Sequence, residues 1–407
     1  MNTHLQEPLM NNIFLSKPGV ITCAGFNADE LWASVTTGNQ SGIKKVKAVS
    51  EEDFFAGRIE ESKLKPTSAR FSMKIHRIQE MALEQIAKEV ESVKEKYGAQ
   101  RIAVCVGSCD NGTEFSVAGH KVFFETGKFP SDYSIEMQGA DYPSTFVKEK
   151  FSLKAPCLSF STACSSSAEA IIKGAQLINS GLADAVIAGG VDLVSDTVLL
   201  GFGALEAVSS EITNPFSVNR HGITLGEGAA FFVLTRQDLF STGIELLGYG
   251  ESSDAHHMTS PDPSGAGAEK AMKNALHNAG LKPEDIDYIN LHGTGTKLND
   301  LMESKAVDAV FGSYKIPAST TKPFTGHTLG VGSAVELAVC FQAIVKNRNA
   351  EKIQLPLQMW DGQKDSEIPQ LNFVDKDNCT GFKKVKICMS NSFAFGGSNA
   401  CLIAGER

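Results

Sequence analysis

The sequence predicts an α/β protein built from two similar halves. Apolar runs of four to eight residues, bounded by Gly or charged residues, alternate with longer segments of helical period, which is typical of α/β architecture. Most of the short runs are continuously apolar, as strands buried on both faces are. The candidate strands span 101–107, 157–160, 184–190, 229–235, 244–249, 287–291, 315–319, 384–390 and 399–404. The candidate helices span 75–96, 165–180, 268–279, 300–311 and 332–346.

A faint internal repeat favours the division into halves. CLSF leads into STAC and then into a helix, and later KIPAS leads towards FTGH and another helix. Cys164 and His327 fall at corresponding points, and each half then returns through an apolar strand to a Gly pair. No flexible linker separates the parts. We therefore expect one half over residues 1–243 and a second over 244–407, with the reactive groups at their join.

Composition excludes several function classes. The 407 residues are 42% hydrophobic and 21% charged, as in ordinary globular proteins. The net charge of −9 argues against a general nucleic-acid or anionic-membrane binder, which would carry an excess of positive charge. No uninterrupted apolar stretch is long enough for a membrane span, and the opening MNTHLQEPLMNNIF lacks the pattern of an export signal. The nine unclustered cysteines, with no CxxC pair, predict reduced thiols in a cytoplasmic protein and no zinc site.

Cys164 is the candidate nucleophile. It follows an apolar strand and precedes a helix whose first turn is a run of three serines. The free N–H groups and the positive end of the helix dipole then point at the sulfur. Because such positions favour the thiolate, we expect a lowered pKa for this thiol alone among the nine.

Two later segments supply candidate histidines. His292 ends an apolar strand and precedes a Gly-Thr-Gly-Thr turn, where Thr294 and Thr296 add hydroxyl groups beside glycines that permit close approach to a ligand. Lys322 and His327 lie five residues apart on a Gly-rich connection that is not a Walker loop. Near the C-terminus, SNSFAFGGSNA joins two apolar strands, and a loop of this type either exposes N–H groups to an oxyanion or is a plain β-turn.

These segments resemble a known family. STACSSS, HGTGT followed by Asn299-Asp300, KPFTGH and NSFAFGG occur together in the order seen in β-ketoacyl-acyl carrier protein synthases of the elongating type, synthases I and II. SSDAHHMTSP is most similar to the synthase II branch. The resemblance covers nearly the whole chain. It implies the thiolase-like fold, with the two duplicated halves in an α-β-α-β-α arrangement.

The resemblance also implies the chemistry. Cys164 accepts an acyl group from acyl carrier protein, and His292 and His327 promote the loss of CO2 from malonyl carrier protein, giving a 3-oxoacyl product in fatty acid or related lipid or polyene biosynthesis. Neutral histidines that donate hydrogen bonds suit this role. No metal or cofactor is implied, and the assembly is expected to be a homodimer.

The other implied roles are as follows: Lys322 organises the site; the N–H groups of Cys164 and Phe395 form the oxyanion hole; Thr294, Thr296, Phe393, Phe395 and Asp110 bind substrate; Asp300 and Glu336 support these groups; Arg70, Lys74 and Arg77 dock the acidic carrier. Asp110 either pairs with a neighbour and shortens the acyl pocket or faces a polar-ended substrate, and we favour short or polar-ended acyl groups.

Two other functions stay open: a non-catalytic, chain-length-factor-like subunit of a heterodimeric ketosynthase, and a thiolase. His221 and Ala394 depart from the usual family pattern.

Overall fold

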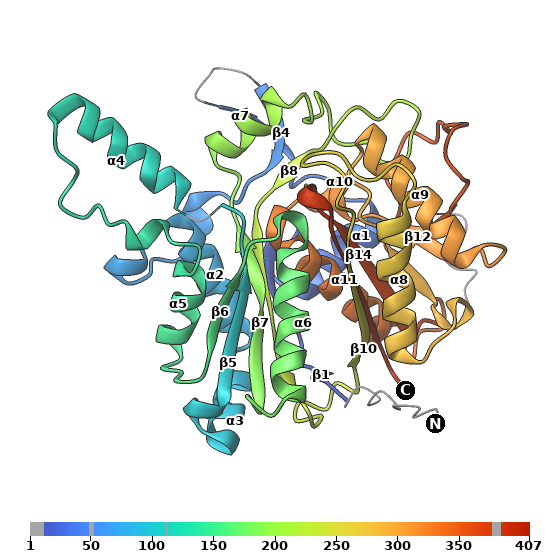
Figure 1. Cartoon of the computed structure of the whole chain (residues 1–407), viewed down its shortest axis with the longest axis horizontal. Helices are drawn as coiled ribbons and strands as arrows, with labels where there is room; N and C mark the ends of the chain where they lie inside the picture. Colours follow the sequence, from blue (N-terminus) through green and yellow to red (C-terminus); the bar gives the residue numbers. More distant parts are fainter. Residues whose placement is uncertain (1–11, 49–52, 111, 377–383) are drawn as a thin grey trace, which may run out of the picture.

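The computed structural model describes residues 12–48, 53–110, 112–376 and 384–407. Five layers of helices and strands lie side by side (Figure 1). The helices are α1 (Ala28–Thr37), α2 (Lys74–Gln85), α3 (Ala87–Tyr97), α4 (Thr113–Thr126), α5 (Tyr142–Lys150), α6 (Ser166–Asn179), α7 (Asp196–Ala204), α8 (Ala266–Ala279), α9 (Lys297–Phe311), α10 (Lys322–Thr325) and α11 (Gly332–Asn347).

Most strands belong to one twelve-stranded sheet, and three others form a small second sheet. The strands are β1 (Phe14–Leu15), β2 (Gly19–Thr22), β3 (Lys44–Lys47), β4 (Asp53–Gly57), β5 (Ile102–Gly107), β6 (Cys157–Phe160), β7 (Ala185–Asp192), β8 (Leu225–Gly226), β9 (Gly228–Thr235), β10 (Glu245–Ser253), β11 (Tyr288–Asn290), β12 (Pro317–Ser319), β13 (Asn372–Phe373), β14 (Ile387–Phe393) and β15 (Ser398–Gly405). The predicted α/β fold and its nine strands are confirmed, with ends that shift by a few residues.

The strand order supports the internal repeat. In the first half the order is β6-β5-β7-β9, with the first three strands parallel and β9 antiparallel. In the second half β12-β11-β14-β15 has the same pattern of directions. Cys164 follows β6 and His327 follows β12, which are equivalent strands in the two halves. The boundary between residues 243 and 244 stays a prediction.

Two helices fill the middle layer. α6 and α11 pack on each other between the two halves of the sheet and contribute to one apolar core (Figure 1). The segment Leu329–Asn347 is long and apolar enough to cross a membrane, but 89% of it is buried inside the fold, so its apolar character is explained by packing. α2, α3 and α5 cover the outer face of the first half, and α8 and α9 cover that of the second.

The prediction of one continuous helix over residues 75–96 was wrong. The segment 75–96 forms α2 and α3, separated at Ile86, whose φ of −109° and ψ of 10° are not helical. Ile86 is buried, and no Gly or Pro marks the break. Ile86 belongs to the apolar core that these helices share with the sheet, and we attribute the bend to that packing.

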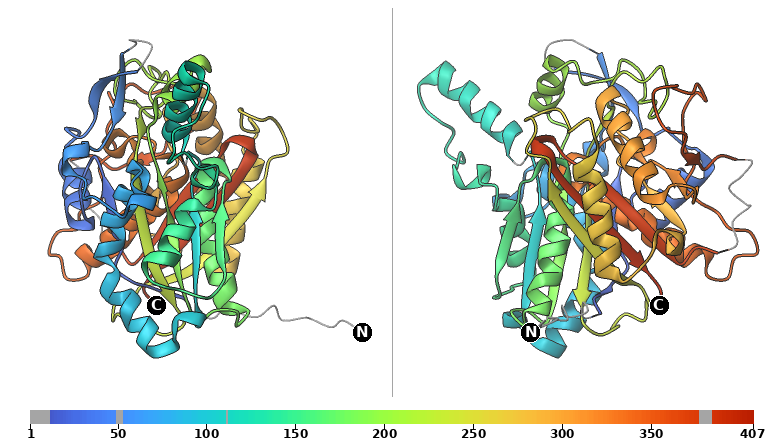
Figure 2. Two further views of the ribbon diagram at one scale, coloured as in Figure 1. Left: turned by 90° about the vertical axis from the view of Figure 1, so that its left-hand side faces the viewer. Right: turned by 45° about the vertical axis from the view of Figure 1, so that its right-hand side comes forward.

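Four longer helices were missed by the sequence analysis, namely α1, α4, α5 and α7. Of these, α4 projects from the body of the molecule (Figures 1 and 2). Large apolar side chains on α4 and the segment after it are exposed, including Phe124 and Ile135, which are each 82% exposed. A surface helix is predicted from an apolar stripe that faces the protein core. The apolar residues of α4 do not face the core of this chain, so its sequence lacks that stripe.

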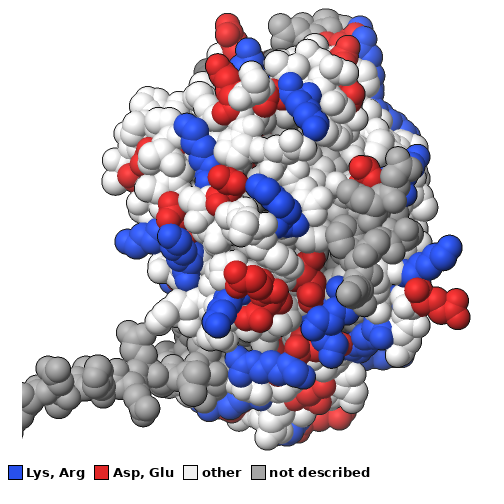
Figure 3. Space-filling model, turned by 90° about the vertical axis from the view of Figure 1, so that its right-hand side faces the viewer, with Lys and Arg blue, Asp and Glu red and all other residues white. Residues whose placement is uncertain are grey.

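Charges of both signs are mixed on the outer face of the second half. Figure 3 shows Lys and Arg interspersed with Asp and Glu over this face. The eight cysteines that the structure describes are free thiols, as predicted, and Cys379 lies outside the described residues. The opening residues 1–11 lie outside them as well.

Candidate active site

Cys164 lies in a tight turn between β6 and α6. The preceding residue, Ala163, has a φ of +51°, a left-handed conformation that costs a non-glycine residue about 1–2 kcal/mol. The Ala163 carbonyl accepts hydrogen bonds from Ser166 Oγ at 2.6 Å and from Cys109 Sγ at 3.0 Å. These contacts hold a strained turn that presents the nucleophile, and Cys164 is only 7% exposed.

The predicted lowering of the Cys164 pKa was wrong. Burial raises the pKa of this thiol to about 11, although the Lys322 ammonium and a hydrogen bond from the Phe395 N–H act in the opposite direction. The prediction rested on the helix terminus alone, whereas desolvation is the larger effect here. The thiol therefore needs a base at hand.

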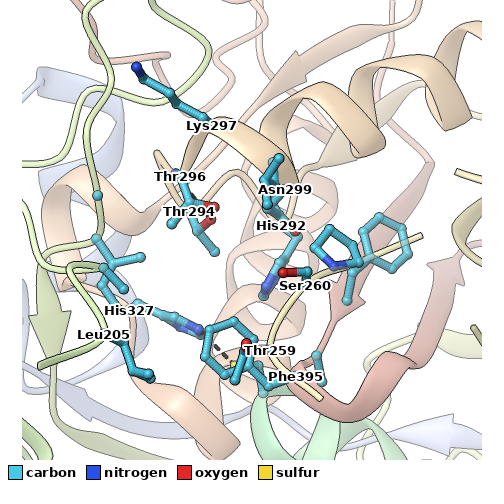
Figure 4. A pocket seen from close by; sticks show the side chains of 18 of the residues that line it. Leu205, Thr259, Ser260, His292, Thr294, Thr296, Lys297, Asn299, His327 and Phe395 are labelled. Atoms are coloured by element: carbon cyan, nitrogen blue, oxygen red, sulfur yellow. Dashed lines mark hydrogen bonds between the residues drawn. The ribbon is translucent and has the colours of Figure 1, made fainter. Parts of the chain in front are cut away.

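His327 is the nearest imidazole to this thiol. Its Nε2 atom lies 3.0 Å from Cys164 Sγ, as the dashed line in Figure 4 marks. The His327 N–H donates to the Thr224 carbonyl at 2.6 Å, and its carbonyl accepts from the Gly226 N–H. The backbone of His327 is thus fixed to β8, while the pKa of its ring is well below the ordinary value because of burial and the nearby Lys322.

His292 approaches the same sulfur from the other side of the cavity. Its ring centroid lies 5.3 Å from that of His327, with the ring planes nearly perpendicular (Figure 4). Burial, Lys322 and His327 all lower the pKa of His292 well below its ordinary value. Both rings are therefore neutral near pH 7, as the predicted role requires.

Glu303 on α9 positions the His292 loop and was missed by the sequence analysis. Its carboxylate accepts hydrogen bonds from the N–H groups of His292 at 2.8 Å and Gly293 at 2.7 Å. Burial raises the pKa of Glu303 to about 7. The available signal was an acidic residue within the buried part of the predicted helix 300–311, where a carboxylate requires partners.

Lys322 and Glu336 form a buried ion pair beneath the histidines. Lys322 Nζ lies 2.5 Å from Glu336 Oε1, and the two side chains are 2% and 4% exposed. Burial raises the pKa of Glu336 to about 6. The positive charge of Lys322 acts on Cys164, His292 and His327 together, since it contributes to the pKa shift of each.

A cavity of about 490 Å³ leads to these residues. The cavity is lined by four of the substrate-binding residues implied by the resemblance: Thr294, Thr296, Phe393 and Phe395. Figure 4 shows that the Lys297 side chain points away from the interior of the cavity. Asp300 supports this wall, because its carboxylate accepts from the Gly295 N–H at 3.2 Å. The sequence analysis missed other lining residues that come from the segment after β10 and from β15: Asp254, Thr259, Ser260, Pro261 and Asn399.

Asp110 does not line this cavity. It is 7% exposed, its carboxylate accepts a hydrogen bond from the Thr113 hydroxyl, and its N–H donates to Asp192 Oδ1 at 2.8 Å. Of the two situations considered for Asp110, pairing with a neighbour is the one found.

The three predicted docking residues are already engaged in ion pairs. Lys74 is the least accessible of the three: its ammonium group lies 2.6 Å from Glu227 Oε1 and its side chain is only 12% exposed, and its docking role stays a prediction. Arg70 pairs with Glu136 and Glu149, and Arg77 pairs with Glu61. Arg70 is the most exposed of the three, with 46% of its side chain accessible.

The two departures from the family pattern lie on the cavity wall. His221 lines it, with Nε2 3.1 Å from Ser209 Oγ and 3.0 Å from Ser210 Oγ. Ala394 precedes Phe395, whose ring stacks on Phe202 with centroids 5.8 Å apart. Both residues border the cavity.

Comparison with known proteins agrees with this geometry. Residues 18–239 match the N-terminal domain of β-ketoacyl synthases, and residues 244–355 match the C-terminal domain. The chain is 31% identical to 3-oxoacyl-[acyl-carrier-protein] synthase 2 of Coxiella burnetii, over 95% of this chain and 96% of that protein. It is 28% identical to the synthase 2 of Staphylococcus aureus (strain COL), over 96% and 97%.

Solved structures show the same fold. The complex of the ketosynthase ApeO with its chain length factor ApeC from Xenorhabdus doucetiae contains a chain that matches with a TM-score of 0.89 and 35% identity, over 100% of both chains. A β-ketoacyl synthase from Burkholderia phymatum STM815 matches with a TM-score of 0.79 and 27% identity, over 98% of this chain and 100% of that one. The domain matches cover most of the sequence and agree with the arrangement of Cys164, His292 and His327: the chain belongs to the β-ketoacyl synthase family.

Proposed function

We propose that the chain condenses an acyl thioester with malonyl carrier protein, giving 3-oxoacyl carrier protein and CO2. The observation that carries this proposal is the convergence of Cys164, His327 and His292 at the inner end of one cavity, with Cys164 Sγ 3.0 Å from His327 Nε2. A thiol, a base and a second neutral imidazole are the groups needed for acyl transfer followed by decarboxylation.

In the first half-reaction Cys164 takes the acyl group. His327 Nε2 accepts the thiol proton, the sulfur attacks the thioester carbon, and the carbon–sulfur bond to the carrier breaks as the carrier thiol leaves with that proton. The N–H groups of Cys164 and Phe395 receive the negative charge that develops on the oxygen. The hydrogen bond from Phe395 to the Cys164 sulfur supports this role, since it brings that N–H to the reacting centre. One such donor contributes about 10²–10³ in rate.

In the second half-reaction the histidines act as donors. The carbon–carbon bond to the malonyl carboxylate breaks, CO2 leaves, and the electron pair forms an enolate whose oxygen accepts hydrogen bonds from neutral His292 and His327. The enolate carbon then attacks the acyl-cysteine carbonyl, and the Cys164 thiolate leaves and takes up a proton from solvent, which balances the proton that left with the carrier thiol. The lowered pKa values of both rings support this assignment.

Acyl carrier protein is the proposed partner. Thr294 and Thr296 line the cavity with hydroxyl oxygens 3.1 Å apart, which suits the amide groups of a pantetheine arm. We place the carrier around the mouth of this cavity, where Lys297 is exposed, with Arg70 and Arg77 as further contacts. The pathway is fatty acid biosynthesis or a related lipid or polyene pathway, and the free cysteines support a cytoplasmic location.

A second subunit completes the proposed assembly. We infer a homodimer, and the exposed apolar side chains of the α4 region support burial against a second subunit. A heterodimer is the second candidate. It is favoured by the 35% identity to a chain from a complex of a ketosynthase with a chain length factor.

The alternative functions lack comparable support. A non-catalytic subunit has no use for a complete set of reactive groups, yet Cys164, His292, His327 and Lys322 are brought together here. A thiolase is disfavoured because both domain matches are to β-ketoacyl synthases.

Incubation with acyl and malonyl carrier proteins, followed by mass spectrometry, tests the proposal. The expected product is an acyl chain longer by two carbons with a 3-oxo group, formed by the wild type and not by Cys164→Ala. Decarboxylation without chain extension, or extension with acetyl-coenzyme A in place of malonyl carrier protein, would contradict it.

A further inference from the structure

The active site also holds the donor set of a metal centre. Cys164, His292 and His327 each offer one ligand atom, and these three atoms lie within 4.8 Å of one another. The residues come from three separate segments and are 7%, 2% and 2% exposed. Such a cluster is buried and assembled before any ligand arrives.

The dimensions suit a tetrahedral ion. Zinc binds thiolate sulfur at about 2.3 Å and imidazole nitrogen at about 2.0–2.1 Å, so neighbouring ligand atoms in a tetrahedral site are roughly 3.3–3.6 Å apart. The Cys164 Sγ to His327 Nε2 distance of 3.0 Å is shorter than this by about half an ångström. The fourth position would face the cavity and be open to water.

The rings have freedom to adjust. The Nδ1 atoms of His292 and His327 have no hydrogen-bond partner among the described residues, so no such bond fixes either ring against a small rotation. Most zinc-bound histidines have such a partner, and its absence here lowers the expected affinity. The ammonium of Lys322 opposes a cation, but its charge is offset by Glu336 at 2.5 Å.

We propose that the acyl-free protein binds one thiophilic divalent cation, such as Zn²⁺, through Cys164, His292 and His327, and that this binding reversibly blocks acylation. The ion replaces the thiol proton, which is released to solvent, so no oxidant or reductant is involved. Imidazole and thiolate suit Zn²⁺ better than Mg²⁺ or Ca²⁺. An acylated Cys164 has no thiolate to offer, so acyl group and metal exclude each other.

Titration with Co²⁺, whose spectrum reports thiolate and imidazole ligands, tests the site directly. One equivalent should give a thiolate-to-cobalt charge-transfer band in the wild type, and Zn²⁺ should displace it. The band should vanish in Cys164→Ala and require at least tenfold more Co²⁺ in His327→Ala. Cys157→Ser is the matched control, because Cys157 is a partly exposed free thiol that contributes no ligand, and it should titrate as the wild type does.

Protection of the thiol provides a second, independent measurement. One equivalent of Zn²⁺ should slow labelling of Cys164 by a cysteine-directed electrophile at least tenfold, and a chelator should restore it. No band in the wild type, the same band in Cys164→Ala, or unprotected labelling would overturn the inference. Neither measurement depends on condensation, so a protein that binds Co²⁺ but forms no 3-oxoacyl product would contradict the proposed function alone.

Discussion

Cys164 combines a high pKa with a nucleophilic task, and His327 reconciles the two. At pH 7 a thiol with a pKa of about 11 carries very little thiolate, so in the proposed mechanism its reactivity depends on proton transfer to the imidazole 3.0 Å away. An ordinary thiol, with a pKa of about 8.5, reaches its maximal rate of alkylation soon above that pH.

We therefore predict that alkylation of Cys164 by iodoacetamide keeps rising between pH 8.5 and 10, because the thiolate fraction rises through that whole range. Peptide mass spectrometry of the acyl-free protein measures the rate at this residue. In His327→Ala, acylation from acyl carrier protein should fall by about 10²–10⁴, the usual contribution of general-base catalysis. An alkylation rate that levels off by about pH 9.5, as for an ordinary thiol, is the result that contradicts the raised pKa.

The two histidines are expected to differ in the steps they serve. His327 Nε2 lies 3.0 Å from the sulfur and is the group placed to take the thiol proton, so His292→Ala should retain at least partial acylation of Cys164. Release of CO2 from malonyl carrier protein should fall strongly, by about 10² or more, in both His292→Ala and His327→Ala. Mass spectrometry of acyl-Cys164 and assay of labelled CO2 separate the half-reactions. Undiminished CO2 release in both variants would remove the proposed role.

Asp110 is the residue we expect to limit the acyl chain. Asp110 is buried outside the cavity and its carboxylate is held by Thr113, so we expect it to shorten the acyl pocket by filling space, and the wild type should prefer hexanoyl over tetradecanoyl carrier protein. Asp110→Gly should shift the ratio of kcat/KM towards the longer chain by at least about tenfold, or 1.4 kcal/mol. Asp110→Asn keeps the size and removes the charge, which separates the two effects. A wild type that prefers the longer chain, with no shift in Asp110→Gly, shows that the residue lies away from the acyl group.

Among the elements, we expect α9 to affect catalysis, because its Glu303 side chain binds the loop that carries His292. This carboxylate accepts two N–H groups of the His292 loop, whereas a glutamine offers one acceptor and presents an NH2 group to the second N–H. Glu303→Gln should therefore lower the free energy of unfolding by about 1–3 kcal/mol. It should also reduce CO2 release more than acylation, since His292 is displaced.

Urea unfolding and the two half-reaction assays measure these effects. Asp308→Asn, an exposed change on the same helix, is the control and should leave both unchanged. Equal losses in the two half-reactions would indicate general damage to the fold instead of a displaced His292.

The elements also show what the sequence could predict. α6 and α11 were found because a strand, a reactive residue and a buried helix follow one another in each half, so local pattern and tertiary role agree. The break between α2 and α3 was missed because it depends on packing at Ile86, which no neighbouring residue signals. In the site, each motif residue could be identified from its own segment of sequence. The hydrogen bonds from the His292 loop to Glu303 and the high pKa of Cys164 arise only when distant segments enclose these residues.

At the scale of the whole molecule, the projecting α4 region is a surface that the single chain leaves uncovered. Phe124 and Ile135 are each 82% exposed, on an arm that stands away from the body in two views (Figures 1 and 2). Exposed apolar side chains gathered in one region mark an interface more often than they belong to a monomer.

We predict that light scattering of the purified wild type gives twice the mass of one chain and that Phe124→Ser with Ile135→Ser gives the mass of one chain. Each serine removes an apolar side chain whose burial contributes about 1.5–3 kcal/mol, enough together to weaken association by roughly 10²-fold or more. Leu182→Ser, which alters an apolar side chain 58% exposed in the loop after α6, should leave the mass doubled. A wild type that stays monomeric at high concentration contradicts the homodimer and favours a non-identical second subunit. Addition of that subunit should then give a heterodimer that forms through the same α4 region.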